Sequence, residues 1–113
     1  MTNKYGARRG ECRYGHQHDS QGEIKRCWEL AQMVNKGMIT DLAVHPRWEL
    51  VVNNHKIGRY TGDFSYIEKG VFVVEDVKPF NRKTGKVVAS RDYILRKKLM
   101  FACHGIEIKE TPA

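Results

Sequence analysis

Long apolar runs are absent from this sequence, and cysteine is scarce. No segment approaches the roughly 18 apolar residues of a membrane helix, and the first ten residues, MTNKYGARRG, lack the apolar core of a signal peptide. The three cysteines, Cys12, Cys27 and Cys103, are an odd and sparse set that does not suit a disulfide framework. We therefore expect a protein without membrane contact that works in a reducing compartment such as the cytoplasm.

Acidic side chains are also in the minority. The chain has 13 Asp and Glu residues against 20 Lys and Arg residues, which gives a net charge of +7. Eight basic residues lie between Lys78 and Lys98 against one acid, Asp92, so this segment alone carries an excess equal to the net charge. Such a concentration indicates a polyanionic partner, with nucleic acid as the first choice. A solvated lysine-rich loop and helix is the alternative that the charge pattern leaves open.

The length and composition indicate one globular domain with an additional N-terminal arm. A hydrophobic content of 41% over 113 residues is sufficient for a single core. Residues 1–19 show no hydrophobic periodicity and contain glycines and four basic side chains. They predict a flexible basic arm, and residues 20–113 are expected to form the single domain.

The local signals predict two helices and four strands. Ser20 and Ser90 are expected N-caps, and Gly37 and Gly105 are expected to end the two helices. The predicted helices span 20–36 and 90–104. The predicted strands span 42–52, 57–67, 71–78 and 106–108, with turns at 53–56 and 68–70. The order αβββαβ predicts an α/β (α+β) fold.

A pattern of acids and one lysine lies on the second and third predicted strands. Asp63 falls in the second strand, and Asp76 and Lys78 share one face of the third because strand side chains two apart point the same way. Glu75 has the opposite parity, so we expect it to face solvent or a helix and its replacement by alanine to be mild. An ion pair between the two strands, without catalytic meaning, is the structural alternative.

This pattern suits the hydrolysis of a phosphodiester bond. Such a reaction needs a strong nucleophile made from water and a means to offset developing negative charge. A hard cation, Mg²⁺ or Mn²⁺, does both and prefers carboxylate and carbonyl oxygens. Asp63, Asp76 and the backbone carbonyl of Val77 are the predicted ligands. Lys78 is the predicted catalytic partner, which would orient or deprotonate the attacking water and stabilise charge on the phosphate.

Several short motifs in order resemble the PD-(D/E)XK nuclease superfamily, the restriction-endonuclease-like fold, and most closely a group of very small phage-encoded members. The matching motifs are a D-S-x-x-E helix start, a D-F pair, V-E-D-V-K and G-I-x-I, which correspond to residues 19–23, 63–64, 74–78 and 105–108. The resemblance covers most of the chain from Asp19 to Glu110. Gly62 stands where the family's motif has proline, a residue that is often missing in the superfamily.

The resemblance implies a restriction-endonuclease-like core, with a mixed sheet flanked by helices, and a Mg²⁺-dependent (or Mn²⁺-dependent) DNA endonuclease. Within the resembled families, a structure-specific enzyme that resolves Holliday junctions or trims branched DNA fits a minimal domain. Such an enzyme implies a homodimer, no organic cofactor and a place in the cytoplasm of a bacterial host. A less selective phage DNA-processing nuclease, or a non-catalytic basic DNA-binding accessory protein, is the alternative.

Glu23 has two interpretations. As the third residue after Ser20 it suits a capping box. It also begins a helical stripe with Cys27, Leu30 and Val34, which aims its carboxylate inward and, through the resemblance, makes it a candidate catalytic residue and metal ligand.

The basic segment supplies the predicted DNA contacts, which are Arg82, Lys83, Lys86, Arg91, Lys97 and Lys98. Lys98 falls inside an expected core arc of the second helix formed by Ile94, Leu95, Leu99 and Ala102. Its side chain is expected either to pack its stem and extend its amine to water, or to reach the phosphate at the active site.

A zinc site is a weaker alternative. It would draw on Cys12, His16, His18 and Cys27. These residues straddle the arm and the first helix, and their spacing matches no usual zinc finger.

Overall fold

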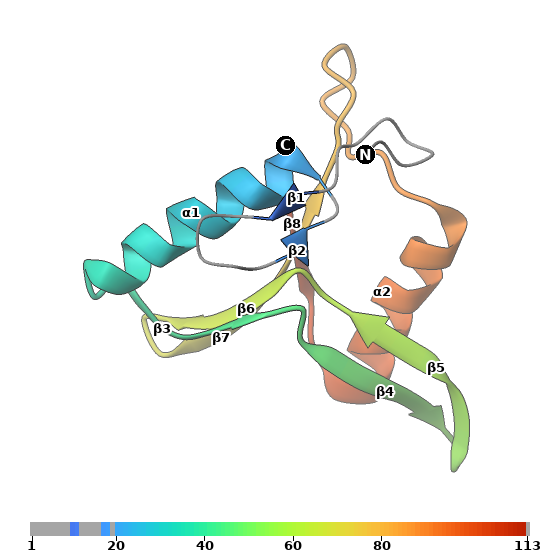
Figure 1. Cartoon of the computed structure of the whole chain (residues 1–113). Coiled ribbons are helices and arrows are strands. Elements are labelled where there is room, and N and C mark those ends of the chain that lie inside the picture. The colour runs from blue at the N-terminus through green and yellow to red at the C-terminus, as the bar shows by residue number, and fades with distance from the viewer. Residues whose placement is uncertain (1–9, 12–16, 19, 113) are drawn as a thin grey trace.

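The computed structural model describes residues 10–11, 17–18 and 20–112, and these form an α+β fold (Figure 1). Both expected N-caps are confirmed. Ser20 precedes α1 (Gln21–Asn35) and accepts a hydrogen bond from the Glu23 amide at 3.1 Å. Ser90 precedes α2 (Arg91–His104) in the same way, and Gly105 ends that helix with a φ of 67°. Left-handed backbone of this kind favours glycine, which explains the stop.

The main sheet is mixed and has four strands in the order β3-β6-β7-β8. Its strands are β3 (Ile39–Val44), β6 (Phe64–Glu68), β7 (Val71–Lys78) and β8 (Ile108–Pro112). The pairs β3–β6 and β6–β7 are antiparallel, and β8 runs parallel to β7 after the crossover through α2. A separate hairpin joins β4 (Arg47–Val52) to β5 (His55–Thr61). β1 (Gly10–Glu11) pairs with β2 (Gln17–His18). The rest of the arm predicted at 1–19 lies outside the described residues.

Two predicted strands are each broken in two. The strand expected at 42–52 is interrupted at His45–Pro46, and the one expected at 57–67 is interrupted at Gly62–Asp63. The breaks face each other, because the His45 amide donates to the Asp63 carbonyl and the Gly62 amide donates to the Pro46 carbonyl, both at 2.9 Å. The two paired chain segments therefore bend together at this point. On one side of the bend, β3 and β6 belong to the main sheet, and on the other side β4 and β5 form the separate hairpin. The prediction for the last strand is also wrong in its bounds, because β8 spans 108–112 and the predicted strand spans 106–108.

The predicted tight turns are confirmed, although β5 already begins at His55. Asn53 and Asn54 have φ values of 50° and 65°, and Lys69 and Gly70 have values of 52° and 78°. Two consecutive left-handed residues are typical of the hairpin turn whose twist matches that of the strands. These turns fix the pairing of β4 with β5 and of β6 with β7.

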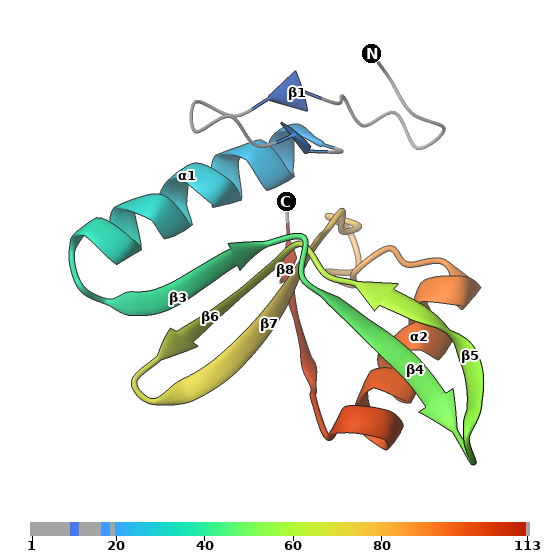
Figure 2. The same ribbon diagram turned by 60° about the horizontal axis from the view of Figure 1, so that its bottom comes forward.

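Two hydrophobic cores lie on opposite faces of β7. Figure 2 shows the two helices, α1 and α2, on opposite sides of the sheet. The first is formed under α1 by Cys27, Leu30, Ile39, Phe64 and Tyr66. The second is formed by α2, the β4–β5 hairpin and the main sheet, with Leu50, Tyr60, Val74, Tyr93, Met100 and Ile108. Alternation along β7 serves both cores, since Val73 and Val77 pack on the first and Val74 lies in the second.

The helix stripes were predicted with unequal success. Glu23, Cys27 and Leu30 of α1 are buried as expected, whereas Val34 is exposed. Most of the arc predicted for α2 is wrong. Ile94, Leu95 and Ala102 are exposed, Leu99 alone of the four packs against the second core, and the buried residues of this helix are Tyr93 and Met100. Apolar and charged residues alternate on every face of α2, so the sequence of the helix alone does not determine which face is buried. Packing against the β4–β5 hairpin determines it, since Leu50 and Tyr60 share a core with Tyr93 and Met100.

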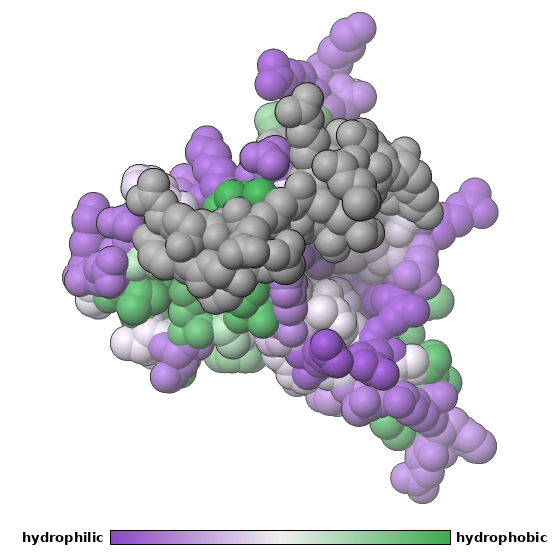
Figure 3. Space-filling view, viewed as in Figure 1, coloured by the Kyte–Doolittle hydropathy of each residue, from purple (hydrophilic) through white to green (hydrophobic). Residues whose placement is uncertain are grey.

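Hydrophilic side chains dominate the surface seen in Figure 3, above all on the loop that projects beyond β7 and along the β4–β5 hairpin. Neither helix of the described chain combines the length and the apolar composition needed to cross a membrane.

Candidate metal centre

The bend in the ribbon places Asp63 at the border of the two sheets, next to β7. The backbone amide of Asp63 donates to the Glu75 carbonyl at 3.1 Å, which continues the β6–β7 ladder by one residue. Gly62 allows this approach: a Cβ at that position would meet Val74 Cγ1 at 3.3 Å and Tyr60 Cε2 at 3.4 Å. The prediction that Asp63 belongs to a strand is therefore wrong by one residue, because the chain bends there before β6 begins.

The carboxyl group of Asp63 has two hydrogen-bonding partners in β7. Its Oδ2 accepts from the Val77 amide at 2.7 Å, and the group is hydrogen-bonded to the carboxyl group of Asp76. Burial, with the negative charges of Asp76 and Glu23, raises the pKa of Asp63 to about 10. Without a cation, the carboxyl group of Asp63 therefore carries a proton at neutral pH.

Asp76 and Lys78 share a face of β7, as their parity predicts. Lys78 Nζ lies 3.2 Å from Asp76 Oδ1, and the Tyr60 hydroxyl donates to Asp76 Oδ2 at 2.5 Å. The same Nζ lies 3.9 Å from the centroid of the Tyr93 ring, a cation–π contact. Asp76 is 5% exposed. Both β7 side chains are thus held in place by groups from β5 and α2.

Glu23 takes part in both the cap of α1 and the acidic cluster, through its backbone and its side chain respectively. Its backbone amide donates to the cap Ser20. Its carboxylate is buried and lies 2.9 Å from Nε2 of His45, measured from Oε1. The inward orientation inferred from the helical stripe is confirmed.

His45 is a member of the site that sequence reasoning missed. One ligand atom from each of Glu23, His45 and Asp63 lies within 4.8 Å of the others. The signal in the sequence is faint: a His-Pro pair that interrupts an otherwise strand-like run. Tyr60, Tyr93 and Glu110 were also not recognised as site residues. The Tyr93 hydroxyl donates to Glu110 Oε2 at 2.8 Å, and burial of the Tyr93 ring, with Glu110 and Asp76 nearby, raises the pKa of that hydroxyl.

Glu75 faces α1, which confirms its parity, but its burial argues against the expectation that its loss is mild. It is fully buried, and its carboxylate accepts from Arg26 Nε at 2.5 Å and Arg26 Nη2 at 3.1 Å, and from the Tyr66 hydroxyl at 2.6 Å. Burial alone would raise the pKa of Glu75, but these hydrogen bonds outweigh it and keep the pKa below its ordinary value. Glu75 is a structural anchor between α1 and the sheet.

The predicted DNA-binding residues are mostly exposed. The loop after β7 is an ordered projection, in which Asn81 Oδ1 accepts from the amides of Lys83 at 2.8 Å and Thr84 at 3.2 Å, and Phe80 bridges to Val87. Arg82, Lys83, Lys86 and Arg91 lie on its surface or at the start of α2.

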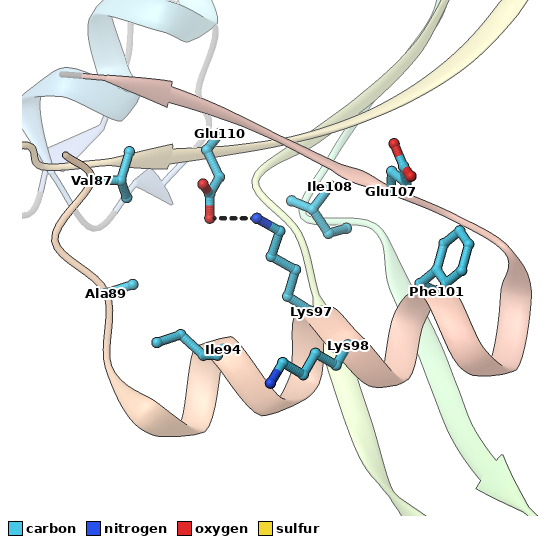
Figure 4. A pocket seen from close by; sticks show the side chains of 9 residues that line it. All are labelled: Val87, Ala89, Ile94, Lys97, Lys98, Phe101, Glu107, Ile108 and Glu110. Atoms are coloured by element: carbon cyan, nitrogen blue, oxygen red, sulfur yellow. Dashed lines mark ion pairs between the residues drawn. The ribbon is translucent and has the colours of Figure 1, made fainter. Parts of the chain in front are cut away.

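The two lysines of α2 differ in their surroundings. Lys98 is exposed, which excludes the predicted packing of its stem in a core arc, whereas Lys97 Nζ pairs with Glu110 Oε2 at 3.2 Å (Figure 4). Both lysines line an open groove of about 610 Å³ between α2 and β8. Its other lining residues are Val87, Ala89, Ile94, Phe101, Glu107, Ile108 and Glu110. The groove adjoins the Lys78 region through Tyr93 and Glu110.

The zinc alternative finds no support among the described residues. Cys27 is buried in the first core, with Leu30 and Phe64 in the same cluster. Cys12 and His16 lie outside the described residues, as does the side chain of His18.

Residues 2–111 match the model of a family described as "Protein of unknown function (DUF1064)". The chain belongs to this family. Neither a curated protein nor a solved structure matches it. The family description assigns no activity, so the functional argument rests on the geometry.

Proposed function

We propose that this protein is a divalent-metal-dependent endonuclease that hydrolyses phosphodiester bonds of DNA. The observation that carries this proposal is that the carboxyl group of Asp63 lies near both Glu23 of α1 and Asp76 of β7, with the ammonium group of Lys78 on Asp76. Lys78 ends β7, so the pair that it forms with Asp76 lies at the start of the projecting basic loop (Figure 1). The chain order α1, β3, β6, β7, α2, β8 supports a restriction-endonuclease-like core.

The donor set fits Mg²⁺ or Mn²⁺. Burial, together with repulsion from the negative charges of Asp76 and Glu23, raises the pKa of Asp63, so ionising all three carboxyl groups at once is unfavourable. A divalent cation would replace the proton and remove the repulsion. Asp63, Asp76 and Glu23 would hold the ion, with the Val77 carbonyl as a further oxygen ligand. When bound, the ion supplies an activated water and charge neutralisation at the phosphate.

The remaining groups have separable roles in this proposal. Tyr60 fixes the carboxylate of Asp76 through its short hydrogen bond. Lys78 is held between Asp76 and the Tyr93 ring, where its positive charge can stabilise a phosphate oxygen as charge develops there. A static, preformed cation of this kind costs no reorganisation during the reaction.

The basic loop and α2 would bind the DNA backbone. Arg82, Lys83 and Lys86 project from the molecule, and Lys98 lines the groove beside β8. Contacts of this type follow charge and shape and carry no base sequence. We therefore propose branched DNA, such as a Holliday junction, as the substrate, and a homodimer as the form that cuts two strands symmetrically. By the resemblance to phage enzymes, this activity belongs in the cytoplasm of a bacterial host.

The test compares four-way, flapped and linear DNA substrates with and without Mg²⁺ or Mn²⁺. Asp76→Ala and Lys78→Ala should lower cleavage by about two to three orders of magnitude while DNA binding persists. Asp92→Ala and Lys36→Ala are matched controls, since both residues are exposed and neither belongs to the acidic cluster. Cleavage by Asp76→Ala at the wild-type rate would refute the nuclease assignment. Equal cutting of linear and branched DNA by a monomer would refute only the junction-specific part.

A further inference from the structure

Glu23, His45 and Asp63 form a cluster with both nitrogen and oxygen donors. The three residues come from α1, from the bend after β3 and from the bend before β6. Their ligand atoms all lie within 4.8 Å of one another, and His45 Nε2 is 2.9 Å from Glu23 Oε1. Asp76 is not a member of this group. The cluster therefore lies on the α1 side of Asp63, whereas Asp76 and Lys78 lie on β7.

The spacing within the cluster suits neighbouring ligands of one ion. Two adjacent ligands of an octahedral cation, each about 2.1 Å from the metal, are separated by about 3 Å. The 2.9 Å between His45 Nε2 and Glu23 Oε1 has this length. Ligation requires the Nε2 lone pair, so the ring proton must reside on Nδ1 in the loaded site. The contact seen here would then be replaced by two bonds to the same ion.

The backbone holds His45 in a conformation that it would not choose freely. Its φ is 56°, in the left-handed region that most side chains avoid. The hydrogen bonds from the His45 amide to Asp63 and from Gly62 to Pro46 maintain it. A strained residue that the surrounding structure fixes is frequent at functional sites. Here the strain turns an imidazole toward two carboxylates.

We propose that Glu23, His45 and Asp63 bind a first-row transition-metal ion, Mn²⁺ or one that binds more tightly, in preference to Mg²⁺. Imidazole nitrogen suits transition metals, whereas Mg²⁺ binds through oxygen and retains its waters. The catalytic meaning of this site rests on the proposed nuclease function, because Glu23 and Asp63 belong to both groups. The binding itself does not, and it can be measured without DNA.

The test measures Mn²⁺ binding by the electron paramagnetic resonance signal of free Mn²⁺, with Mg²⁺ as competitor. The variant is His45→Asn, since asparagine tolerates left-handed backbone and has no imidazole. His55→Asn is the matched control at an exposed position of the β4–β5 hairpin. We expect His45→Asn to weaken Mn²⁺ binding about tenfold or more and Mg²⁺ binding less than threefold. Unchanged Mn²⁺ affinity, or equal losses for both ions, would overturn the proposal.

A second measurement uses the wild-type protein and does not depend on how the variant folds. The Mn²⁺-loaded protein should show the ¹⁴N coupling of a directly bound imidazole in pulsed electron paramagnetic resonance. This coupling should persist in His55→Asn. Its absence from the wild-type protein would overturn the proposal. A protein that shows the coupling but cuts no DNA would retain this metal site and lose the nuclease function instead.

Discussion

The ammonium group of Lys78 lies over the ring of Tyr93, with Nζ 3.9 Å from the ring centroid. Lys78 ends β7, and Tyr93 is in the first turn of α2, so one contact connects the sheet to the helix that follows the basic loop. Asp76 Oδ1 approaches the same Nζ at 3.2 Å. The position of the proposed catalytic lysine therefore depends on α2 as well as on its own strand.

Two replacements of Tyr93 should distinguish the contribution of its ring to cleavage from that of its hydroxyl group. Tyr93→Phe keeps the ring under Lys78 and loses only the hydrogen bond to Glu110, so we expect cleavage within about threefold of wild type. Tyr93→Leu removes the cation–π contact, worth about 0.5 to 2 kcal/mol, and should lower kcat about threefold to thirtyfold with KM little changed. The measurement is steady-state cleavage, corrected for the folded fraction. An equal loss of kcat in both variants would contradict a role for the ring.

Asp63→Asn should leave the metal-free protein intact while it abolishes cleavage. Because the raised pKa keeps Asp63 protonated, its carboxyl group already acts as donor and acceptor, as an amide does. Asparagine can still accept from the Val77 amide and donate to Asp76. We expect an unchanged or higher melting temperature without metal, and cleavage reduced at least about a hundredfold. Asp63→Ala is the contrast, since it leaves the Val77 amide unpaired at a cost of about 1 to 3 kcal/mol.

The same pair of proteins gives a pH test. Asp63 has a folded pKa of about 10, above its ordinary value of 3.8, so the folded state binds a proton that the unfolded state releases. Its contribution to stability is greatest below about pH 4 and is lost as the pH rises toward 10. In the absence of metal, the wild-type free energy of unfolding should fall more steeply with rising pH than that of Asp63→Asn. Parallel curves from urea unfolding at several pH values would show that Asp63 is ionised.

Glu75→Ala should destabilise the fold strongly. It removes the closest acidic partner of Arg26, whose side chain is only 17% exposed, and leaves that charge with the longer, 3.7 Å contact to Glu29. Breaking a buried pair of this type costs about 3 to 5 kcal/mol. Glu29→Ala is the matched control, because the 42%-exposed Glu29 side chain is 3.7 Å from the same arginine and should contribute less than about 1 kcal/mol. Urea denaturation measures both, and equal effects would contradict the anchoring role of Glu75.

Glu23→Gln and Ser20→Ala should separate helix capping from activity. The cap uses the Glu23 backbone amide, which glutamine retains, so Glu23→Gln should fold normally and lose most cleavage. Ser20→Ala removes the cap acceptor and should cost about 1 kcal/mol of stability with cleavage retained. Thermal unfolding and cleavage assays are the measurements. An active Glu23→Gln protein would leave Glu23 with a structural role only.

The basic loop should control the salt dependence of DNA binding. Replacing Arg82, Lys83 and Lys86 by alanine, one at a time, should weaken binding to all sequences alike. Removing one side chain that binds a phosphate should flatten the dependence of log affinity on log salt by about one unit. Lys36→Ala is the control, an exposed lysine after the far end of α1. A change that depends on the DNA sequence would point to base contacts instead.

The sequence predicted those parts of the fold whose signals are local. Ser20 and Ser90 are side-chain caps, Gly105 is a left-handed stop, and 71–78 alternates between two faces. Each of these depends on residues a few positions apart. The parity that separates Asp76 from Glu75 is equally local and needed no knowledge of their partners.

The missed features depend on contacts between distant residues. The bend at Gly62–Asp63 exists because His45–Pro46 bends opposite it, which hydrophobic alternation along one strand does not reveal. Glu75 is structural because Arg26, on another element, reaches it. The same bend, with the left-handed φ of His45, places this residue beside Glu23 and Asp63. Neither its residue type nor its neighbours in the sequence predict that position.

The bend also leaves the tip of the β4–β5 hairpin, beyond Leu50, far from the site and free to vary. The acidic cluster lies on the near side of the bend, and α2 holds the hairpin through buried residues no farther out than Leu50. Beyond that point Val51, Val52 and Ile57 are all exposed. Lengthening the tip by matched pairs of residues would preserve which side chains face α2. The tip of this hairpin can therefore change in length and charge, during evolution or by engineering, without displacing a residue of the proposed site.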